Sequence, residues 1–516
     1  MKTNRWPQSP QFLGFLLIIC LLGWFSNCAP QQKLTPAQLE GLQKWPKEAA
    51  LFFQKGDYYS LQEAYQRWKK LLALNYHQPP VPQRYLETIF LLTLREKELA
   101  IPQAKFLAEA ERFLAKNPRL KKYASLLPLI KKSPLKLEGF IDEFHWMRVE
   151  PQLKLQLKEL ALTSSWWAYL YLHLFFPWPE DKEMYSRIST TFSQSPLVKY
   201  KLLLTGPKKM ALFIKFFQEN PNFQEMHYFL GKEYLNAGQL AQAEKHLQQA
   251  RSSFPDSLNI LILLSKINFR LEEFEACLEL NEAALKLKPE FRDALLGKVM
   301  CLTFLGRHEE AISTAQQLLD LGFYYLGEAH YWLARNFHEL KKLTQAWQEI
   351  TEAKNYLIGW NEVHALAGEI ALDQNNLSEA EKNFKEALRI KDSDCQSAFS
   401  LGKIYSRQQN WLDSADYYRQ AAFCFGQQKK NLIQEINEIK ASNLSPTRIK
   451  RFITKKKLQV ARLRQIEATA YFNAAASYFN SKRYQAARQM AEKALSHPQF
   501  QEKAAELIKK INEVIK

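Results

Sequence analysis

Small side chains recur in this chain at intervals of about 34 residues, always at matching places in a helical pattern. In one clear example, Gly231, Gly238, Ala243 and Ala250 are followed by Pro255. Apolar residues spaced i, i+3, i+4 and i+7 place the small side chains on one face of each helix. Two helices joined by a short turn can cross closely only where those side chains are small. Gly238 suits the turn, and Pro255 ends the second helix.

The same spacing begins again along the C-terminal half of the chain. Units start near residues 224, 258, 292, 327, 361, 395 and 468. Six units run in step, which disfavours the alternative of a helical bundle with chance spacing. With only 16 glycines and few alternating strand patterns, the chain is predicted to be all-α. Stacked helix-turn-helix units bury their faces on their neighbours and form an α-solenoid with a concave groove.

This pattern resembles the tetratricopeptide repeat (TPR) family, whose period is about 34 residues. The resemblance covers residues 224–428, as six units, and residues 468–500, as a seventh. It implies a right-handed superhelix that binds protein partners. Residues 501–516 are typical of the polar capping helix that a terminal unit needs. Residues 36–223 are helical but less regular, and we interpret them as degenerate repeats or a helical N-terminal domain.

The resemblance also implies which side chains line the groove. In that family the inner wall comes mainly from positions two, five, nine and twelve of the first helix of each unit. The basic and aromatic members at those positions are Tyr228, Lys232, Lys266, Phe269, Tyr331, Arg335, His338, Phe399, Lys403 and Phe472. Such a wall suits an acidic or amphipathic peptide or helix. Five acidic residues at the same wall reduce its positive charge: Glu225, Asp293, Glu328, Glu362 and Glu369. The alternative is that the wall residues are solvated and bind no partner.

A basic stretch breaks the period between the sixth and seventh units. We predict a basic helical insertion over residues 429–467, in which Ser445 and Pro446 begin a helix. Between residues 446 and 466 there is no acidic residue, and the basic ones are Arg448, Lys450, Arg451, Lys455, Lys456, Lys457, Arg462 and Arg464. Two interpretations are open. In the first, the basic side chains lie on the outer face of the helix and are solvated. In the second, they contact anionic lipid or an acidic partner.

The N-terminus has the pattern of an export signal. A short basic region precedes an apolar run over residues 12–25, which is shorter than the roughly 20 residues that span a bilayer. The four residues ending at Cys28 resemble a bacterial lipobox, with Phe and Asn where Leu and a small residue are usual. We therefore expect removal of residues 1–27, lipidation of Cys28 and a tether over residues 28–35. An uncleaved signal anchor is the alternative, and both place the chain at a membrane of the bacterial cell envelope, on the outer membrane or the periplasmic face.

The sequence contains no nucleophile elbow, Walker loop, zinc-protease motif or EF-hand loop. We expect no catalytic site, metal or cofactor. A minor alternative is an enzyme site within residues 36–223, where Asp142, Glu143 and His145 cluster. No cysteines are spaced C-x-x-C, so those in helical segments are expected to behave as small apolar residues: Cys277, Cys301, Cys395 and Cys424. The expected partners are envelope assembly proteins and a membrane, with an anionic surface as a further option and no nucleic acid, although the net charge is +18.

Overall fold

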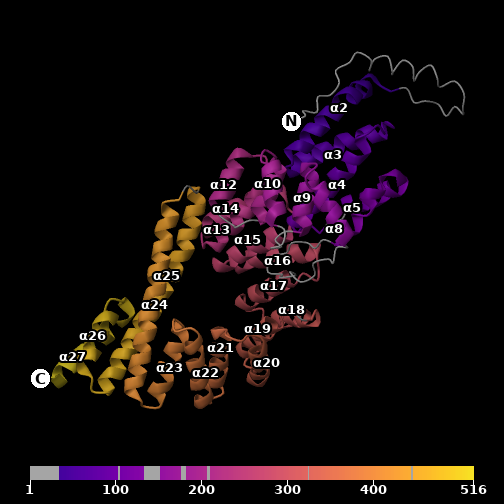
Figure 1. Cartoon of the computed structure of the whole chain (residues 1–516). Helices are drawn as coiled ribbons and strands as arrows, with labels where there is room; N and C mark the ends of the chain where they lie inside the picture. The colour runs from indigo at the N-terminus through magenta and orange to yellow at the C-terminus, as the bar shows by residue number, and fades with distance from the viewer. Residues whose placement is uncertain are drawn as a thin grey trace, which may run out of the picture.

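Every regular element in the described part of the chain is a helix. The computed structural model describes residues 34–102, 105–132, 151–175, 182–205, 210–322, 325–442 and 445–515. Within these ranges the chain forms α2 to α27 and two short 3-10 helices, with no strand. Most helices pack beside the next helix in the sequence, and in the C-terminal half they form a continuous row of antiparallel hairpins (Figure 1). The predicted all-α solenoid is confirmed. The predicted signal segment, Cys28 and the Asp142–His145 cluster lie outside the described residues.

The N-terminal region begins with a helical hairpin whose ends are fixed by local chemistry. The Thr35 side chain accepts a hydrogen bond from the backbone N of Gln38 and completes a capping box at the start of α2. Gly56, with φ 73°, ends α2, and Asp57 then caps α3. The elements of this region are α2 (Pro36–Lys55), α3 (Tyr58–Ala73), α4 (Val81–Glu98), α5 (Lys105–Lys116), η1 (Pro118–Leu120), α6 (Lys121–Ala124), α7 (Leu127–Lys132), α8 (Pro151–Leu160), α9 (Ser165–Phe175), α10 (Lys182–Thr191), α11 (Pro196–Thr205) and α12 (Met210–Glu219).

A buried ionic network joins this region to the first repeat. Arg95 of α4 pairs with Glu225, at the start of α13, and both side chains are fully buried. Lys201 of α11 pairs with Glu98 of α4. Burial opposes ionisation of Glu98, but the charges of Lys201, His173 and Arg95 outweigh it and hold the pKa of Glu98 well below its ordinary value. Because removing one member would leave a buried charge unpaired, the network fixes how the N-terminal region meets the solenoid.

The C-terminal half is a row of helical hairpins that follow the predicted period. Each of the first five hairpins has helices of 11 to 14 residues. The pairs are α13 (Met226–Asn236) with α14 (Leu240–Ser253), α15 (Leu258–Arg270) with α16 (Phe274–Leu287), α17 (Arg292–Phe304) with α18 (His308–Asp320), α19 (Leu326–Glu339) with α20 (Leu343–Tyr356), α21 (Asn361–Asp373) with α22 (Leu377–Ile390), α23 (Cys395–Arg407) with α24 (Trp411–Lys440), and α25 (Pro446–Asn480) with α26 (Tyr484–Ala494). η3 (Pro498–Phe500) and α27 (Gln501–Ile515) end the array.

The small residues lie where the helices of one hairpin cross. A Cβ atom added at Gly231 would lie 2.6 Å from Cγ of Leu247 on the partner helix. One added at Gly402 would lie 2.8 Å from the ring of Tyr418. Ala243, like its counterparts in the other units, is fully buried. The prediction that these positions face inward is confirmed, because there is no room for a larger side chain.

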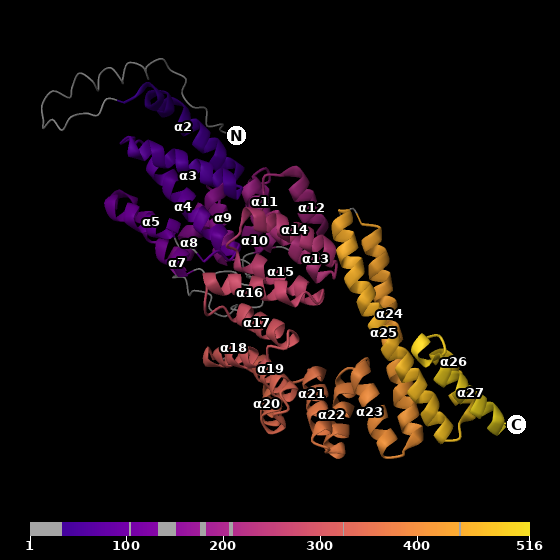
Figure 2. The ribbon, with the colours of Figure 1, turned by 180° about the vertical axis from the view of Figure 1, so that it is seen from behind.

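The sixth and seventh hairpins differ from the rest because they share two long helices. α24 has 30 residues and α25 has 35, and they run antiparallel along their whole length. The described residues of 429–467, predicted as an insertion, are the continuation of α24 and the first part of α25. In Figures 1 and 2 the far end of this pair lies beside α12, α13 and α14. The array therefore bends round, and its last units return to its first.

Candidate protein-interaction surface

Two of the predicted groove residues line a cavity between three successive units. Tyr331 and Arg335 project from α19 into a cavity of about 310 Å³. The opposite sides come from α21, α23 and α24, and from the turn before α23. The other lining residues are Asn361, Glu362, Ala365, Leu366, Glu369, Lys391, Ser393, Asp394, Cys395, Gln396, Phe425 and Gln428. The first helices of neighbouring units thus build one wall, as the repeat pattern predicts.

The charge at this cavity is mixed. The Arg335 guanidinium also lies 5.8 Å from the ring centre of Phe304. Burial raises the pKa of Glu369, although the charges of Arg335 and His338 oppose that rise. Burial likewise raises the pKa of Tyr331. The cavity is therefore lined by two cations, Arg335 and Lys391, and by three carboxyl groups, Glu362, Glu369 and Asp394, of which Glu369 holds its proton more readily than usual.

The other eight predicted basic and aromatic groove residues do not join this cavity, whereas Glu362 and Glu369, two of the acidic residues predicted on the same wall, do. Tyr228 is 2% exposed, and its hydroxyl accepts a hydrogen bond from Nδ2 of Asn259 at 3.0 Å. Phe399 packs edge-on against Tyr418, with ring centres 5.2 Å apart. Phe472 stacks on Phe500 beside the capping helix, at 5.3 Å. Tyr228 therefore takes no part in an open groove wall, whereas Phe399 and Phe472 are half-buried and their place in a groove stays a prediction.

The remaining predicted positions have local roles or face solvent. Phe269 packs edge-on against Phe274, and His338 Nε2 lies 3.1 Å from Oδ2 of Asp373. Lys266 and Lys403 are exposed and Lys232 is half-buried. The position rule for the first helix of each unit therefore selects residues of three kinds, and among its basic and aromatic residues only Tyr331 and Arg335, both in the fourth unit, line the cavity.

Sequence reasoning missed the contribution of α24. Phe425 and Gln428 enter the cavity from the second helix of the sixth unit, beyond the length that an ordinary repeat helix reaches. The break in the period after residue 428 was the available signal, because it showed that this helix could continue.

A second cavity lies between α24, α25 and α26. It has a volume of about 920 Å³. Phe423 is 64% exposed at its edge, and the Tyr478 hydroxyl donates a hydrogen bond to Asp416 at 2.5 Å. Arg419 and Lys493 also line it. None of the predicted groove residues takes part, so this cavity belongs to a different surface.

The basic stretch on α25 makes ion pairs within the chain. Arg448 Nε lies 3.0 Å from Oε2 of Glu244, and Arg451 pairs with both Glu244 and Glu273. Two further pairs are Arg462 with Glu272, at 2.7 Å, and Lys456 with Glu435 of α24. The expectation of one solvated basic surface is therefore wrong for Arg448, Arg451 and Lys456, whereas Arg462 is paired and still exposed. Of the others, Lys455 is half-buried and three are exposed: Lys450, Lys457 and Arg464.

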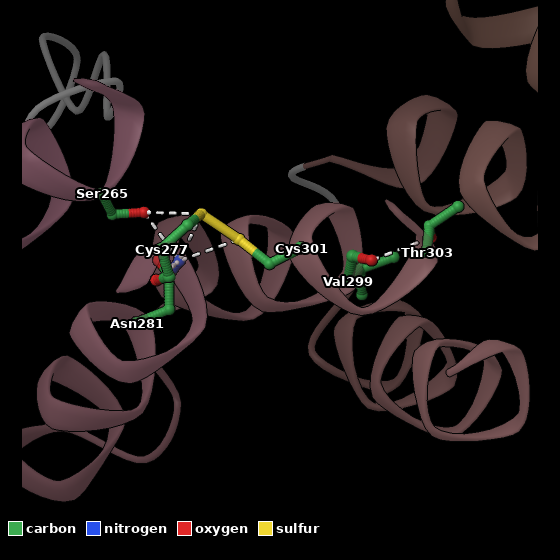
Figure 3. The surroundings of a disulfide bond; sticks show 6 residues. All are labelled: Ser265, Cys277, Asn281, Val299, Cys301 and Thr303. Atoms are coloured by element: carbon green, nitrogen blue, oxygen red, sulfur yellow. Dashed lines mark hydrogen bonds between the residues drawn. A yellow bond between two sulfur atoms is a disulfide. The ribbon is translucent and has the colours of Figure 1, made fainter. Parts of the chain in front are cut away.

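The four helical cysteines form two disulfides, so the expectation that they act as small apolar residues is wrong. Cys277 of α16 is bonded to Cys301 of α17, which joins the second unit to the third (Figure 3). Asn281 lies against this disulfide and donates a hydrogen bond to Oγ of Ser265 at 2.7 Å. Cys395 and Cys424 link α23 to α24. Their sequence separations of 24 and 29 residues match no local motif, and only the stacking of helices brings each pair together.

The described residues contain no cluster of three or more His, Cys, Asp or Glu side chains suited to a metal ion. Nδ1 of His227 lies 2.9 Å from Nδ1 of His246, and burial lowers the pKa of His246 to about 4. A neutral pair of this kind shares one hydrogen bond and stabilises the first hairpin. In the same part of the chain, no helix combines the length and the apolar character needed to cross a bilayer.

The hairpins, their close crossings and the surface between units define a helical-repeat solenoid. A tetratricopeptide repeat family model matches residues 228–290 and 366–429, and a second one matches residues 468–496. The chain therefore contains tetratricopeptide repeats. Solenoids of this class present extended surfaces to other proteins, so the matches support protein–protein interaction as its general role.

The chain is also similar to individual repeat proteins. Anaphase-promoting complex subunit 3 of Schizosaccharomyces pombe is 24% identical over 193 residues, which are 35% of this chain and 28% of that protein. This chain thus matches less than a third of that relative's length. Among solved structures, a thermophilic TPR protein of Thermus thermophilus has 17% identity and a TM-score of 0.31, and covers 34% of this chain and 94% of its own. A tetratricopeptide repeat protein from Parabacteroides merdae has 18% identity and a TM-score of 0.32, and covers 56% and 98%.

Proposed function

We propose that this chain is an exported, membrane-anchored scaffold that binds a peptide or helix of a partner protein at the cavity between α19, α21, α23 and α24. The observation that carries the proposal is the convergence of Tyr331 and Arg335, from the fourth unit, and Phe425, from the sixth, on one cavity. Its volume of about 310 Å³ falls at the lower end of the range for ligand pockets. A partner would therefore insert one or two side chains there and lay the rest of its contact along the array.

The chemistry of the lining favours a segment that combines an acidic and an apolar side chain. Arg335 can donate two parallel hydrogen bonds to a carboxylate. Tyr331 and Phe425 provide apolar area beside it. A short acidic–aliphatic motif is the partner class that fits.

Export and anchoring are part of the same proposal. Disulfides persist in oxidising compartments and are rare in the cytosol, so the bonds Cys277–Cys301 and Cys395–Cys424 support an address outside the cytoplasm. The lipobox-like sequence ending at Cys28 supplies the attachment, and a lipid-modified cysteine with more than one acyl chain holds a protein stably at a membrane. The setting is the bacterial cell envelope, with an envelope assembly component as the partner.

Site-specific photocrosslinking in cells tests the cavity. A photoreactive amino acid at Gln396, which is exposed at the cavity edge, should give a discrete adduct. The same amino acid at Lys382, exposed on α22 and outside the cavity, is the position control. Arg335→Glu should abolish the Gln396 adduct, while Lys403→Glu, the same charge change at an exposed position outside the cavity, should leave it. An adduct that survives Arg335→Glu would remove this cavity from the proposal.

A second candidate function is contact with an anionic membrane surface through α25. Lys450, Lys457 and Arg464 are exposed on this helix, and each basic residue near an anionic leaflet contributes about 1 kcal/mol. The full-length chain should pellet with phosphatidylserine vesicles and lose that binding in Lys450→Glu/Lys457→Glu. Equal pelleting of the two proteins would leave the peptide scaffold as the function.

A further inference from the structure

The end of the α24–α25 pair docks on the first two units through an acidic surface. We call Glu244, Glu272 and Glu273 the acidic socket. Glu244 is only 4% exposed and is covered by Arg448 and Arg451 of α25. Both oxygens of the Glu273 carboxylate accept hydrogen bonds from the Arg451 guanidinium, in a bidentate pair. The residues joined in these pairs are 178 to 207 positions apart in the sequence.

An apolar contact completes the dock. Phe452 is fully buried in the core cluster that spans the N-terminal region and the first two units. Ile449 and Ile453 pack beside it from the same helix. Two faces of α25 thus make contact with the first units: one pairs with carboxylates, and the other packs against an apolar core. This is the chemistry by which grooves recognise basic amphipathic helices.

The dock is built differently from the contacts between successive units. Units are held by continuous apolar faces, and the second and third also by a disulfide. The long pair touches the first units only by its end, and Arg451 and Arg462 remain 36% and 61% exposed. Leu458, one turn further along α25, is 53% exposed. Ion pairs at such positions weaken with salt and exchange for other charges, whereas Phe452 is fully buried, so only a helix that brings an apolar side chain of its own can replace this end while the repeats stay folded.

We propose that the acidic socket is a second partner site, which takes a basic amphipathic helix of another protein and which α25 occupies in the chain alone. The bound pattern is two arginines three residues apart with a phenylalanine next to the second, as in Arg448, Arg451 and Phe452. A helix that carries this pattern replaces α25, frees the end of the long pair and opens the closed array. The site is separate from the Arg335 cavity and does not depend on it.

A peptide that copies the docked segment provides the probe. A fluorescein-labelled peptide of residues 445–466 is titrated into the full-length chain, and its anisotropy is followed. In the wild-type chain α25 competes with the peptide, whereas Arg448→Glu/Arg451→Glu weakens that competitor. The apparent affinity should rise by about tenfold or more, because the free socket becomes more populated. Adding Glu273→Arg to the double variant should abolish the gain.

Lys450→Glu/Lys457→Glu is the matched control, since it reverses two charges on the same helix at exposed positions. It should bind the peptide as the wild-type chain does. Equal affinities for Arg448→Glu/Arg451→Glu, the control and the wild type would overturn the proposal.

A second measurement does not depend on the folding of any variant. Excess peptide is added to the wild-type chain, and its radius of gyration is measured by small-angle X-ray scattering. The radius should increase with the natural peptide and stay constant with a peptide that carries Arg448→Glu/Arg451→Glu. No increase with the natural peptide would refute displacement. Expansion by phosphatidylserine vesicles but not by the peptide would also refute the partner site, and would make α25 a lipid-binding element.

Discussion

The close crossing of α21 and α22 predicts that one added methyl group destabilises the fifth unit. A Cβ atom at Gly368 would lie 2.7 Å from Cε1 of Phe384, a fully buried ring. Carbon atoms do not approach so closely, and overpacking of this kind costs about 1–3 kcal/mol. Alanine regains about 1 kcal/mol over glycine in helix propensity. We therefore expect Gly368→Ala to lower the free energy of unfolding of this unit by about 1 kcal/mol.

Hydrogen exchange measures this loss where it occurs. The fifth unit packs on the units before and after it, so the effect should be confined to α21, α22 and the adjacent helices. Amides of residues 361–390 should exchange about fivefold faster in Gly368→Ala, and those of the N-terminal region should not change. Global denaturation is less suitable, because a repeat array need not unfold in one step.

A second substitution separates the clash from other effects of the methyl group. Phe384→Leu removes the ring that the new Cβ would meet, and by itself it leaves a small cavity. In the double variant the methyl group occupies part of that space. The double variant should therefore lose less unfolding free energy than the sum of the losses in the two single variants. If Gly368→Ala exchanges as slowly as the wild type, or if the losses are additive, the argument that small residues are required by the helix crossing is refuted.

Three further predictions follow from other parts of the chain. Cys277→Ser/Cys301→Ser should lower the free energy of unfolding by about 3 kcal/mol, seen as a lower midpoint of thermal unfolding, since the bond closes a loop of 24 residues. Burial raises the pKa of Glu96 to about 7 from 4.5, so the folded chain holds a proton that the unfolded chain releases. Stability should therefore fall as the pH rises from about 4.5 to 7, by about 3 kcal/mol, and Glu96→Gln should remove this part of the pH dependence in urea titrations. Cys28→Ser should release the chain from the membrane fraction, and it should abolish metabolic labelling with a radioactive fatty acid.

Much of the fold could be predicted because the same requirement, a small side chain at the helix crossing, recurs in several units. Any one glycine in a helix is ambiguous, but Gly231, Gly368 and Gly402 fall in one register and face a larger side chain on the next helix. The stacking of units follows from that register without knowledge of distant contacts. The irregular N-terminal region carries no such repetition, and its packing depends on Arg95 and Glu225, which are 130 residues apart.

The candidate site was only partly predictable, because its residues depend on features that differ from one unit to the next. Position rules select Tyr331 and Arg335 correctly for the cavity, but they treat every unit as equivalent. Tyr228 and Phe472 lie near the two ends of the array, where Tyr228 is buried in the core shared with the N-terminal region and Phe472 is half-buried beside Phe500. A rule derived from inner units fails there because end units have neighbours of a different kind.

The repeat period does not predict that α25 closes the array. This contact is possible because α25 is much longer than an ordinary repeat helix. A repeat helix of 14 residues extends about 21 Å, whereas the 35 residues of α25 extend about 53 Å. That length carries Arg451 from the seventh unit back to Glu244 in the first hairpin, where two opposite charges meet over a buried phenylalanine. Three of the basic residues on α25, Arg448, Arg451 and Arg462, have their acidic partners in the first two units, far away in the sequence. A charge pattern that reads locally as an exposed surface is therefore one half of an internal contact, and the half that a competing basic helix would replace.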